Sequence, residues 1–314
     1  MTHPGWGGGQ PPGGQPPQPG CYRHPDRPTG LSCARCGRPA CPECLREASV
    51  GFHCVDCIAT DQRSHATART VSGAPMPTAG THTPPRPVIT YLLIAVNTAI
   101  FLATAAQAGS LLNNQHSKLF IDLALYPPAV VLGDYWRLIG SGFLHYGPLH
   151  LLVNMYALYI VGRDCELVLG KARYAAVYAV SLIGGSATVM FGPLNAVTAG
   201  ASGAIFGIFG CVLIILLRLR RSPTAILAII VINVIISVTL PGISWLGHLG
   251  GLAAGTIATA GLLFAPKVLQ FVGVHQPTAK TVVATGWAVI AAVGLLAVAM
   301  IVWRIVDLRA LVGP

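Results

Sequence analysis

A serine and a histidine each stand among glycines in apolar stretches that are long enough to cross a membrane. Ser202 lies in the sequence GASGAIFG, and His248 lies in the sequence GHLGG. Polar and ionisable groups are costly at membrane depth, which makes both side chains candidates for function. A serine nucleophile needs an adjacent base, and the imidazole of His248 could supply one. The alternative is that both side chains serve only in helix packing.

The glycines around these two residues favour close helix packing, which would bring the hydroxyl and the imidazole together. On the histidine segment they recur every four residues and therefore lie on one helical face. Small residues of this kind let two helix backbones approach closely in a membrane. The glycines concerned are Gly203, Gly207 and Gly210 on the serine segment, and Gly247, Gly251 and Gly255 on the histidine segment.

Near the N-terminus, four residue pairs have the spacing of metal ligands. They are Cys21 and His24, Cys33 and Cys36, Cys41 and Cys44, and Cys54 and Cys57. A two-residue gap lets both side chains of a pair bind one metal ion, and two pairs complete a tetrahedral shell. We therefore expect two structural zinc ions, which supply much of the folding free energy of this module.

A disulfide framework is the alternative for these cysteines. The histidine in the first pair and the cytoplasmic location derived below argue against it. His53 is a possible substitute ligand, although it breaks the two-residue rhythm. The module is expected to bind a cytoplasmic protein or to regulate the chain. Nucleic-acid binding is disfavoured because its arginines are interspersed with acidic residues and show no aromatic interleaving.

The composition indicates a membrane protein. The chain has 314 residues, of which 53% are hydrophobic and only 10% are charged, and its mean hydropathy is +0.64. Soluble domains carry about 25% charged residues. The formal net charge of +10 fits bases gathered in cytoplasmic loops better than a nucleic-acid partner.

Seven apolar segments of roughly membrane-spanning length follow the metal-binding pairs. Their expected limits are 88–107, 147–163, 172–191, 201–218, 223–240, 244–265 and 282–303. Lysines and arginines follow the second, fourth and sixth segments, whereas the loops after the third and fifth have none. This distribution predicts a cytoplasmic N-terminus and zinc module, with the C-terminus outside. The expected location is the plasma membrane.

The predicted organisation has five parts. A disordered Gly/Pro/Gln-rich tail without the apolar run of a signal peptide comes first, followed by the zinc module and a flexible linker. A core of six membrane helices comes next, and then a linker and a seventh helix. The expected ranges are 1–20, 21–58, 59–87, 88–265 and 266–314.

Three motifs together resemble the rhomboid family of intramembrane serine proteases. They are the Gly-x-Ser-Gly around Ser202, the histidine His248 two segments later, and the His-x-x-x-Asn of His150 and Asn154 in the second segment. The resemblance covers roughly residues 88–265 and also includes Trp136-Arg137 and Glu166. It implies an all-α polytopic fold with a six-helix core, here with one further helix. The zinc module resembles B-box-type fingers, which usually interleave their ligand pairs, first with third and second with fourth.

The resemblance also assigns roles to residues around the dyad. His150 and Asn154 would form an oxyanion hole with the backbone N–H of Ser202, although both could instead only join helices by hydrogen bonds. Gly200 and Gly203 would support this hole and the substrate cavity. The family has an aromatic residue, usually tyrosine, stacked on the histidine, and Phe206 occupies that position here.

The expected chemistry is hydrolysis of a peptide bond in or near a transmembrane segment of another protein. The Ser202 hydroxyl would attack the carbonyl carbon, with His248 as general base and then as general acid. No carboxylate lies on the histidine segment or near Ser202, so the sequence predicts a dyad. The helix N-terminus at Ser202 would favour a developing oxyanion.

Three other functions remain as alternatives. A catalytically silent relative would bind transmembrane clients, but the sequence retains both Ser202 and His248. A transporter would call for intramembrane carboxylates or repeated halves, and the sequence shows neither. A membrane-anchored zinc scaffold would not require polar residues inside the bilayer.

Overall fold

The computed structural model describes residues 18–48, 51–66, 86–240 and 242–312, which separate into an N-terminal unit and a helical unit. Most of the predicted tail at residues 1–20 and of the predicted linker at residues 59–87 lies outside the described residues.

The N-terminal unit is small and has cysteines at its centre. Strand β1 (Gly20–Cys21) pairs antiparallel with β2 (His24–Pro28), and β3 (Leu45–Glu47) pairs antiparallel with β4 (Phe52–Cys54). The 3₁₀ turn η1 (Pro42–Cys44) precedes β3. The buried hydrophobic cluster consists of the side chains of Cys21, Cys33, Ala40, Cys41, Cys44, Leu45 and Cys54. Such a core buries too little apolar surface to hold so short a chain by itself.

Helix α1 (Val55–Ala66) corrects the predicted end of this unit. The sequence predicted a flexible linker from residue 59, but residues 59–66 continue the helix that begins directly after Cys54. Alanine, glutamine and arginine in this stretch are good helix formers, so a helix started at the cysteine site can extend.

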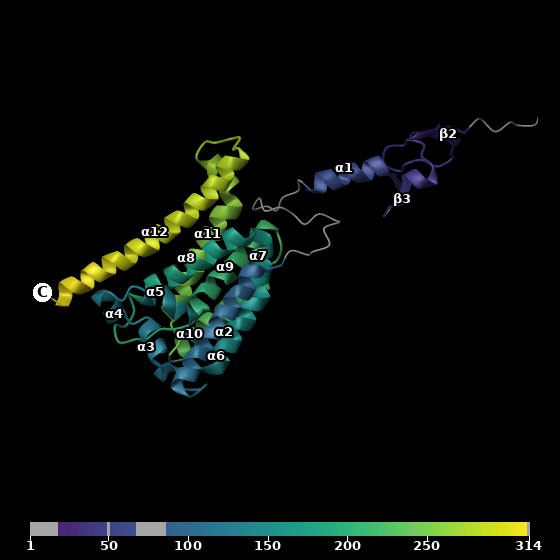
Figure 1. Ribbon diagram of the computed structural model, residues 1–314. Helices are drawn as coiled ribbons and strands as arrows, with labels where there is room; N and C mark the ends of the chain where they lie inside the picture. The colour runs from purple at the N-terminus through teal and green to yellow at the C-terminus, as the bar shows by residue number, and fades with distance from the viewer. Residues whose placement is uncertain (1–17, 49–50, 67–85, 241, 313–314) are drawn as a thin grey trace, which may run out of the picture. The chain divides into compact units, whose positions relative to one another are not determined.

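The helical unit contains a helix at each of the seven predicted segments (Figure 1). They are α2 (Val88–Ala108), α6 (Gly147–Ala157) with α7 (Arg163–Leu169), α8 (Lys171–Val189), α9 (Ser202–Arg218), α10 (Thr224–Thr239), α11 (Trp245–Phe271) and α12 (Ala279–Val312). By length and composition, α2, α11 and α12 can each cross a membrane, and α9 and α10 are shorter apolar helices.

The long loop between α2 and α6 is built of short helical pieces. They are η2 (Asn114–His116), α3 (Lys118–Leu123), α4 (Pro127–Leu132), α5 (Arg137–Gly140) and η3 (Ser141–Phe143). Arg137 holds them together, because its buried guanidinium donates to the carbonyl oxygens of Ile121 and Ala124 and pairs with Asp134.

The second predicted segment is not one regular helix. A π-helical turn, η4 (Leu158–Gly162), separates α6 from α7 and shifts the register of the following residues. On α7, the buried carboxylate of Glu166 accepts hydrogen bonds from the backbone N–H groups of Ile89 and Thr90, at 2.9 and 2.8 Å. Glu166 therefore caps the N-terminus of α2, where a negative charge is favoured.

Helix α11 is longer than predicted. The expected end at residue 265 lies just before Pro266, yet the helix continues to Phe271. Proline removes one backbone hydrogen bond. Buried Ala265 and Leu269 on either side of the proline hold the helix in place against its neighbours.

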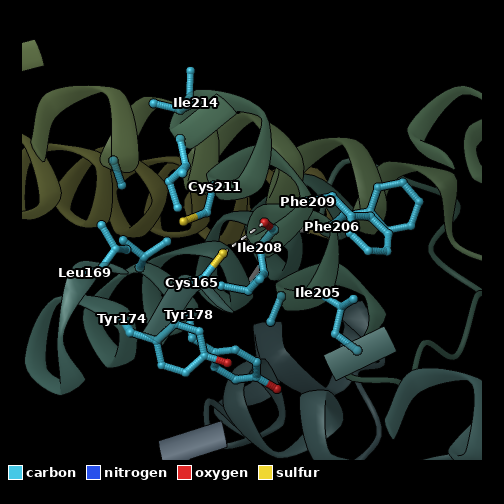
Figure 2. Close-up of a cluster of buried hydrophobic side chains, with 14 of the residues drawn as sticks. Cys165, Leu169, Tyr174, Tyr178, Ile205, Phe206, Ile208, Phe209, Cys211 and Ile214 are labelled. Carbon is cyan, nitrogen blue, oxygen red and sulfur yellow. Dashed lines mark hydrogen bonds between the residues drawn. The ribbon is translucent and has the colours of Figure 1, made fainter. Parts of the chain in front are cut away.

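The core of the unit lies where α8, α9 and α11 pack against one another, and α12 packs along α11 and α8 (Figure 1). Figure 2 shows part of this core, with Phe206 and Phe209 of α9 side by side and the Cys165 thiol directed at the carbonyl oxygen of Ile208. In contrast, α10 lies at an edge, with only Ile226, Ile230 and Ser237 buried.

Candidate active site and metal clusters

Glycine contacts bring the predicted serine and histidine helices together. An added Cβ at Gly203 of α9 would lie 3.1 Å from the carbonyl oxygen of Gly247 of α11. One at Gly255 would lie 2.5 Å from the Cα of Gly207, closer than real Cβ atoms approach. The predicted close approach of these two helices is therefore present. The sequence reasoning missed a third partner, α8, whose Gly185 packs against the same Gly247 carbonyl group.

This packing places the two predicted catalytic side chains in hydrogen-bonding contact. The Nε2 atom of His248 lies 2.7 Å from Oγ of Ser202. The ring of Phe206, one turn after Ser202, stacks on the imidazole with a centroid distance of 4.1 Å and an interplanar angle of 10°. The predicted stacking partner is thus in place, and the imidazole is fixed on one face by an apolar ring.

His150 of α6 lies beside the serine. Its Nδ1 atom accepts a hydrogen bond from the backbone N–H of Tyr146 at 3.1 Å. A neutral imidazole that accepts through Nδ1 carries its proton on Nε2 and can donate from there. A Cβ built on Gly200 would lie 3.1 Å from this Nε2 atom and 3.3 Å from Ser202 Oγ. Both atoms therefore border the space that a side chain at position 200 would fill.

Gly200 itself has a φ of +142°, which side chains other than glycine rarely adopt. The predicted glycine is therefore required by backbone conformation as well as by space.

Asn154 is one turn beyond His150 and is buried beside the same space. Its amide Nδ2 donates to the His150 carbonyl oxygen at 2.9 Å. This bond uses one of the two amide hydrogens. The structure thus brings Asn154 to the wall of the site, with part of its hydrogen-bonding capacity committed to its own helix.

The loop between α8 and α9 forms one edge of the site. Thr198 pairs with Leu125 through two backbone hydrogen bonds of 2.9 Å, and the N–H of Gly200 donates to the carbonyl oxygen of Ser141. The loop is therefore held by the segment between α2 and α6. Irregular backbone at membrane depth is tolerated where it lines a cavity.

A cavity of 880 Å³ opens over the dyad. Ser202, His248, His150 and Asn154 all line it, and its remaining lining is mostly apolar. No aspartate or glutamate is among the described residues that line the cavity. The arrangement can thus bind an extended apolar segment and present a hydroxyl with a base to it, without a carboxylate partner for the imidazole.

Ser237 of α10 is a site residue that sequence reasoning missed. Its Oγ atom lies 2.6 Å from Nδ1 of His248. A single serine in an apolar helix gives no signal of its own.

In the N-terminal unit, the eight predicted ligands form two clusters. Cys21, His24, Cys41 and Cys44 form the first, and Cys33, Cys36, Cys54 and Cys57 form the second. In each cluster the ligand atoms lie within 4.8 Å of one another. The pairs thus combine first with third and second with fourth, the interleaved arrangement implied by the B-box resemblance. His53 belongs to neither cluster.

The spacing of the ligand atoms fits a tetrahedral zinc ion. Metal–sulfur bonds of about 2.3 Å and metal–nitrogen bonds of about 2.0 Å place two tetrahedral sulfurs about 3.8 Å apart, and a sulfur and a nitrogen about 3.5 Å apart. The observed separations are 3.8 Å from Cys36 Sγ to Cys54 Sγ and 3.5 Å from His24 Nδ1 to the sulfurs of Cys41 and Cys44. Both clusters can hold a metal ion.

In the first cluster, the pKa values of two cysteines shift in opposite directions. Burial raises the pKa of Cys44, and the neighbouring Cys41 and Cys21 raise it further, to about 11. Burial also tends to raise the pKa of Cys21, but backbone hydrogen bonds lower it to about 6. Thiolates this close together repel one another, so a cation bound between them would favour their ionised form.

Comparisons with known proteins give a consistent assignment. Residues 132–267 match the Rhomboid domain family. The chain is 36% identical over 118 residues to the putative rhomboid protease YdcA of Bacillus subtilis, a match that covers 37% of this chain and 56% of the relative. It is 35% identical over 183 residues to the rhomboid protease GluP of Bacillus subtilis, covering 56% of this chain and 35% of the relative.

A third relative is the rhomboid protease AarA of Providencia stuartii, 30% identical over 96 residues that cover 31% of this chain and 34% of the relative. The chain thus spans about a third to a half of the length of these relatives. All three matches are to proteins named as rhomboid proteases. Residues 132–267 therefore match a Rhomboid domain, and the chain is a helical integral membrane protein similar in sequence to rhomboid proteases.

Proposed function

We propose that this protein is an intramembrane serine endopeptidase that cuts transmembrane segments of other proteins. The observation that carries the proposal is the 2.7 Å contact between Ser202 Oγ and His248 Nε2 beneath a largely apolar cavity. A serine and a histidine in this contact are the minimum for nucleophilic attack assisted by a general base.

In the proposed reaction, Ser202 Oγ attacks the carbonyl carbon of the scissile peptide bond while its proton passes to His248 Nε2. The C–N bond then breaks as the imidazolium returns the proton to the leaving amine. Water, activated by the same imidazole, hydrolyses the acyl-enzyme.

The oxyanion that forms during attack needs hydrogen-bond donors. The N–H of Ser202 lies in the first turn of α9, where backbone donors have no partner within the helix. The Nε2–H of His150 points into the same space, and Asn154 is the third donor of the proposed hole. Donors fixed in advance inside a water-poor cavity contribute strongly to catalysis.

The membrane arrangement of the proposal has six spans in the core and a seventh in α12. With the N-terminus cytoplasmic, α9 begins near the outer face and the C-terminus lies outside. Two arginines near that end, which the positive-inside rule does not expect, have protein partners. Arg309 donates to the carbonyl oxygen of Val131, and Arg304 donates to that of Met190 and pairs with Asp307.

In the N-terminal unit, the two Cys/His clusters would each hold one structural zinc ion. The ion would supply the positive charge that four close ligands require and would replace the missing apolar core. The proposed task of this zinc module is to bind a cytoplasmic protein, including the cytoplasmic tail of a substrate.

The proposal is tested by reconstituting the full chain in liposomes with a single-span reporter substrate. Cleavage is followed for the wild type, Ser202→Ala and His248→Ala. The expected result is cleavage by the wild type alone, with both variants folded and inserted. Equal behaviour of all three would make Ser202 and His248 packing residues and would favour the alternative, a catalytically silent protein that binds transmembrane clients.

A further inference from the structure

Ser237 is a buried hydroxyl on α10, a helix most of whose other side chains are exposed. Its side chain is 3% exposed, whereas Val231, Ile232, Ile235 and Val238 of the same helix are more than half exposed. A polar group inside a membrane helix is costly and is usually directed at a polar partner. The placement of Ser237 is therefore tied to what its hydroxyl contacts.

The hydroxyl has two partners of different chemistry. Its Oγ atom lies 2.6 Å from the carbonyl oxygen of Asn233 and 2.6 Å from Nδ1 of His248. A carbonyl oxygen can only accept, so the single hydroxyl hydrogen is donated to Asn233. The reverse assignment would leave two oxygen atoms 2.6 Å apart with no hydrogen between them.

Ser237 Oγ must therefore accept from His248, which places the imidazole hydrogen on Nδ1. In a neutral imidazole the other nitrogen, Nε2, then has a free lone pair. This lone pair lies 2.7 Å from Ser202 Oγ and can accept the serine proton. The opposite tautomer would donate from Nε2 to Ser202 and could not act as a base.

We propose that Ser237 is a positioning residue that fixes the reactive tautomer and the ring orientation of His248. It takes the place that a carboxylate holds in a catalytic triad, but as an uncharged acceptor that is itself held by a backbone carbonyl group. No proton leaves Ser237 during the reaction. The Nδ1–H hydrogen bond persists when Nε2 is protonated and stabilises the imidazolium that forms.

The ring is then held from two directions. Phe206 stacks on its face, and Ser237 binds its edge at the atom remote from Ser202. Stacking alone lets the ring slide within its plane as the side chain moves, whereas the hydrogen bond from Nδ1 to Ser237 fixes its edge. This inference rests on the proposed serine protease function, and the experiment below separates the two.

The test compares Ser237→Ala, Ser237→Cys and Ser237→Thr with the wild type in the liposome cleavage assay. Cysteine keeps the volume but accepts hydrogen bonds weakly, and threonine keeps the hydroxyl. Ser181→Ala is the matched control, because Ser181 is also buried and donates to the carbonyl oxygen one turn back, that of Val177, at 2.7 Å. It does not contact the dyad.

We expect kcat to fall about 10- to 100-fold in the alanine and cysteine variants, a share of what a general base contributes. KM should stay within about twofold, since the Ser237 hydroxyl is already bonded to Asn233 and His248. The threonine variant should recover most of kcat, and the Ser181 control should match the wild type. Nitrogen-15 NMR of the histidines, assigned with His248→Ala, should show the proton on Nδ1 in the wild type and a mixture of tautomers in Ser237→Ala.

Undiminished kcat in folded Ser237→Ala, or an unchanged tautomer, would overturn the inference while leaving the dyad intact. A loss of kcat in Ser237→Ala that Ser237→Thr does not recover would also overturn it, because the effect would then not depend on the hydroxyl. If Ser237→Ala fails to fold, the cysteine variant carries the same test. Cleavage by Ser202→Ala would instead refute the proposed function.

Discussion

Substituting Gly255 by alanine should disable the dyad from two helical turns away. A Cβ at this position would lie 2.5 Å from the Cα of Gly207 and 2.6 Å from its carbonyl carbon. Carbon atoms in ordinary contact are about 3.5–4.0 Å apart, so α11 must move away from α9 by about 1 Å. Overpacking of this kind costs about 1–3 kcal/mol of stability.

The same movement acts on catalysis, because Ser202 and His248 stand on these two helices. A shift of about 1 Å lengthens their 2.7 Å contact beyond hydrogen-bonding distance. Misplacement by about 1 Å lowers rates about 100-fold. We therefore expect a loss of that order in kcat for Gly255→Ala, measured by cleavage of the reporter substrate in liposomes.

Gly294→Ala on α12 is the matched control for this experiment. An added Cβ there would lie 3.5 Å from a side-chain carbon of Val180, an ordinary contact. Both changes put alanine into a membrane helix, but only Gly255→Ala forces two helices apart. If folded Gly255→Ala retains wild-type kcat, the close approach of α9 and α11 does not set the dyad, and the reasoning fails.

Three further predictions concern other parts of the chain. Phe206→Ala should lower kcat about 10-fold through loss of the ring that stacks on His248, whereas Phe206→Tyr should retain activity, as reporter cleavage would show. Zinc binding to the N-terminal unit should weaken as pH falls, because the metal-bound state holds fewer protons and Cys44, with a pKa of about 11, must lose one. Zinc titrations at several pH values between about 6 and 8 test this. A zinc affinity that does not change with pH would contradict it. Glu166→Gln should destabilise the helical unit by about 1–3 kcal/mol, because an amide cannot replace a carboxylate that accepts hydrogen bonds from both N–H groups at the start of α2. An unchanged midpoint of thermal unfolding would argue against this helix cap.

Much of the candidate site could be predicted because its signals are local. Four-residue spacing placed His150 and Asn154 on one face, and the glycines around Ser202 and His248 predicted the close helix pair. The two-residue gaps of the cysteine pairs predicted the ligands of both clusters. In each case the residues that act together are fixed by helix periodicity or by a tight turn.

The features that sequence reasoning missed depend on tertiary contacts. Ser237 matters only because α10 and α11 place it against His248, and nothing in its own helix distinguishes it. Gly185 of α8 became a third partner for the same reason. Gly162, at the end of the π-turn η4, packs so closely that an added Cβ would lie 2.6 Å from the hydroxyl of Tyr174, and periodicity alone cannot show such a contact.

The central claim is that His248 activates Ser202 as a nucleophile, and covalent labelling tests it most directly. The full chain in liposomes is treated with a fluorophosphonate, which forms a phosphorus–oxygen bond to activated serines and releases fluoride. Peptide mass spectrometry then locates the adduct. The account predicts an adduct on Ser202 in the wild type and none in folded His248→Ala. An unlabelled Ser202 in the wild type, or equal labelling without His248, would contradict it.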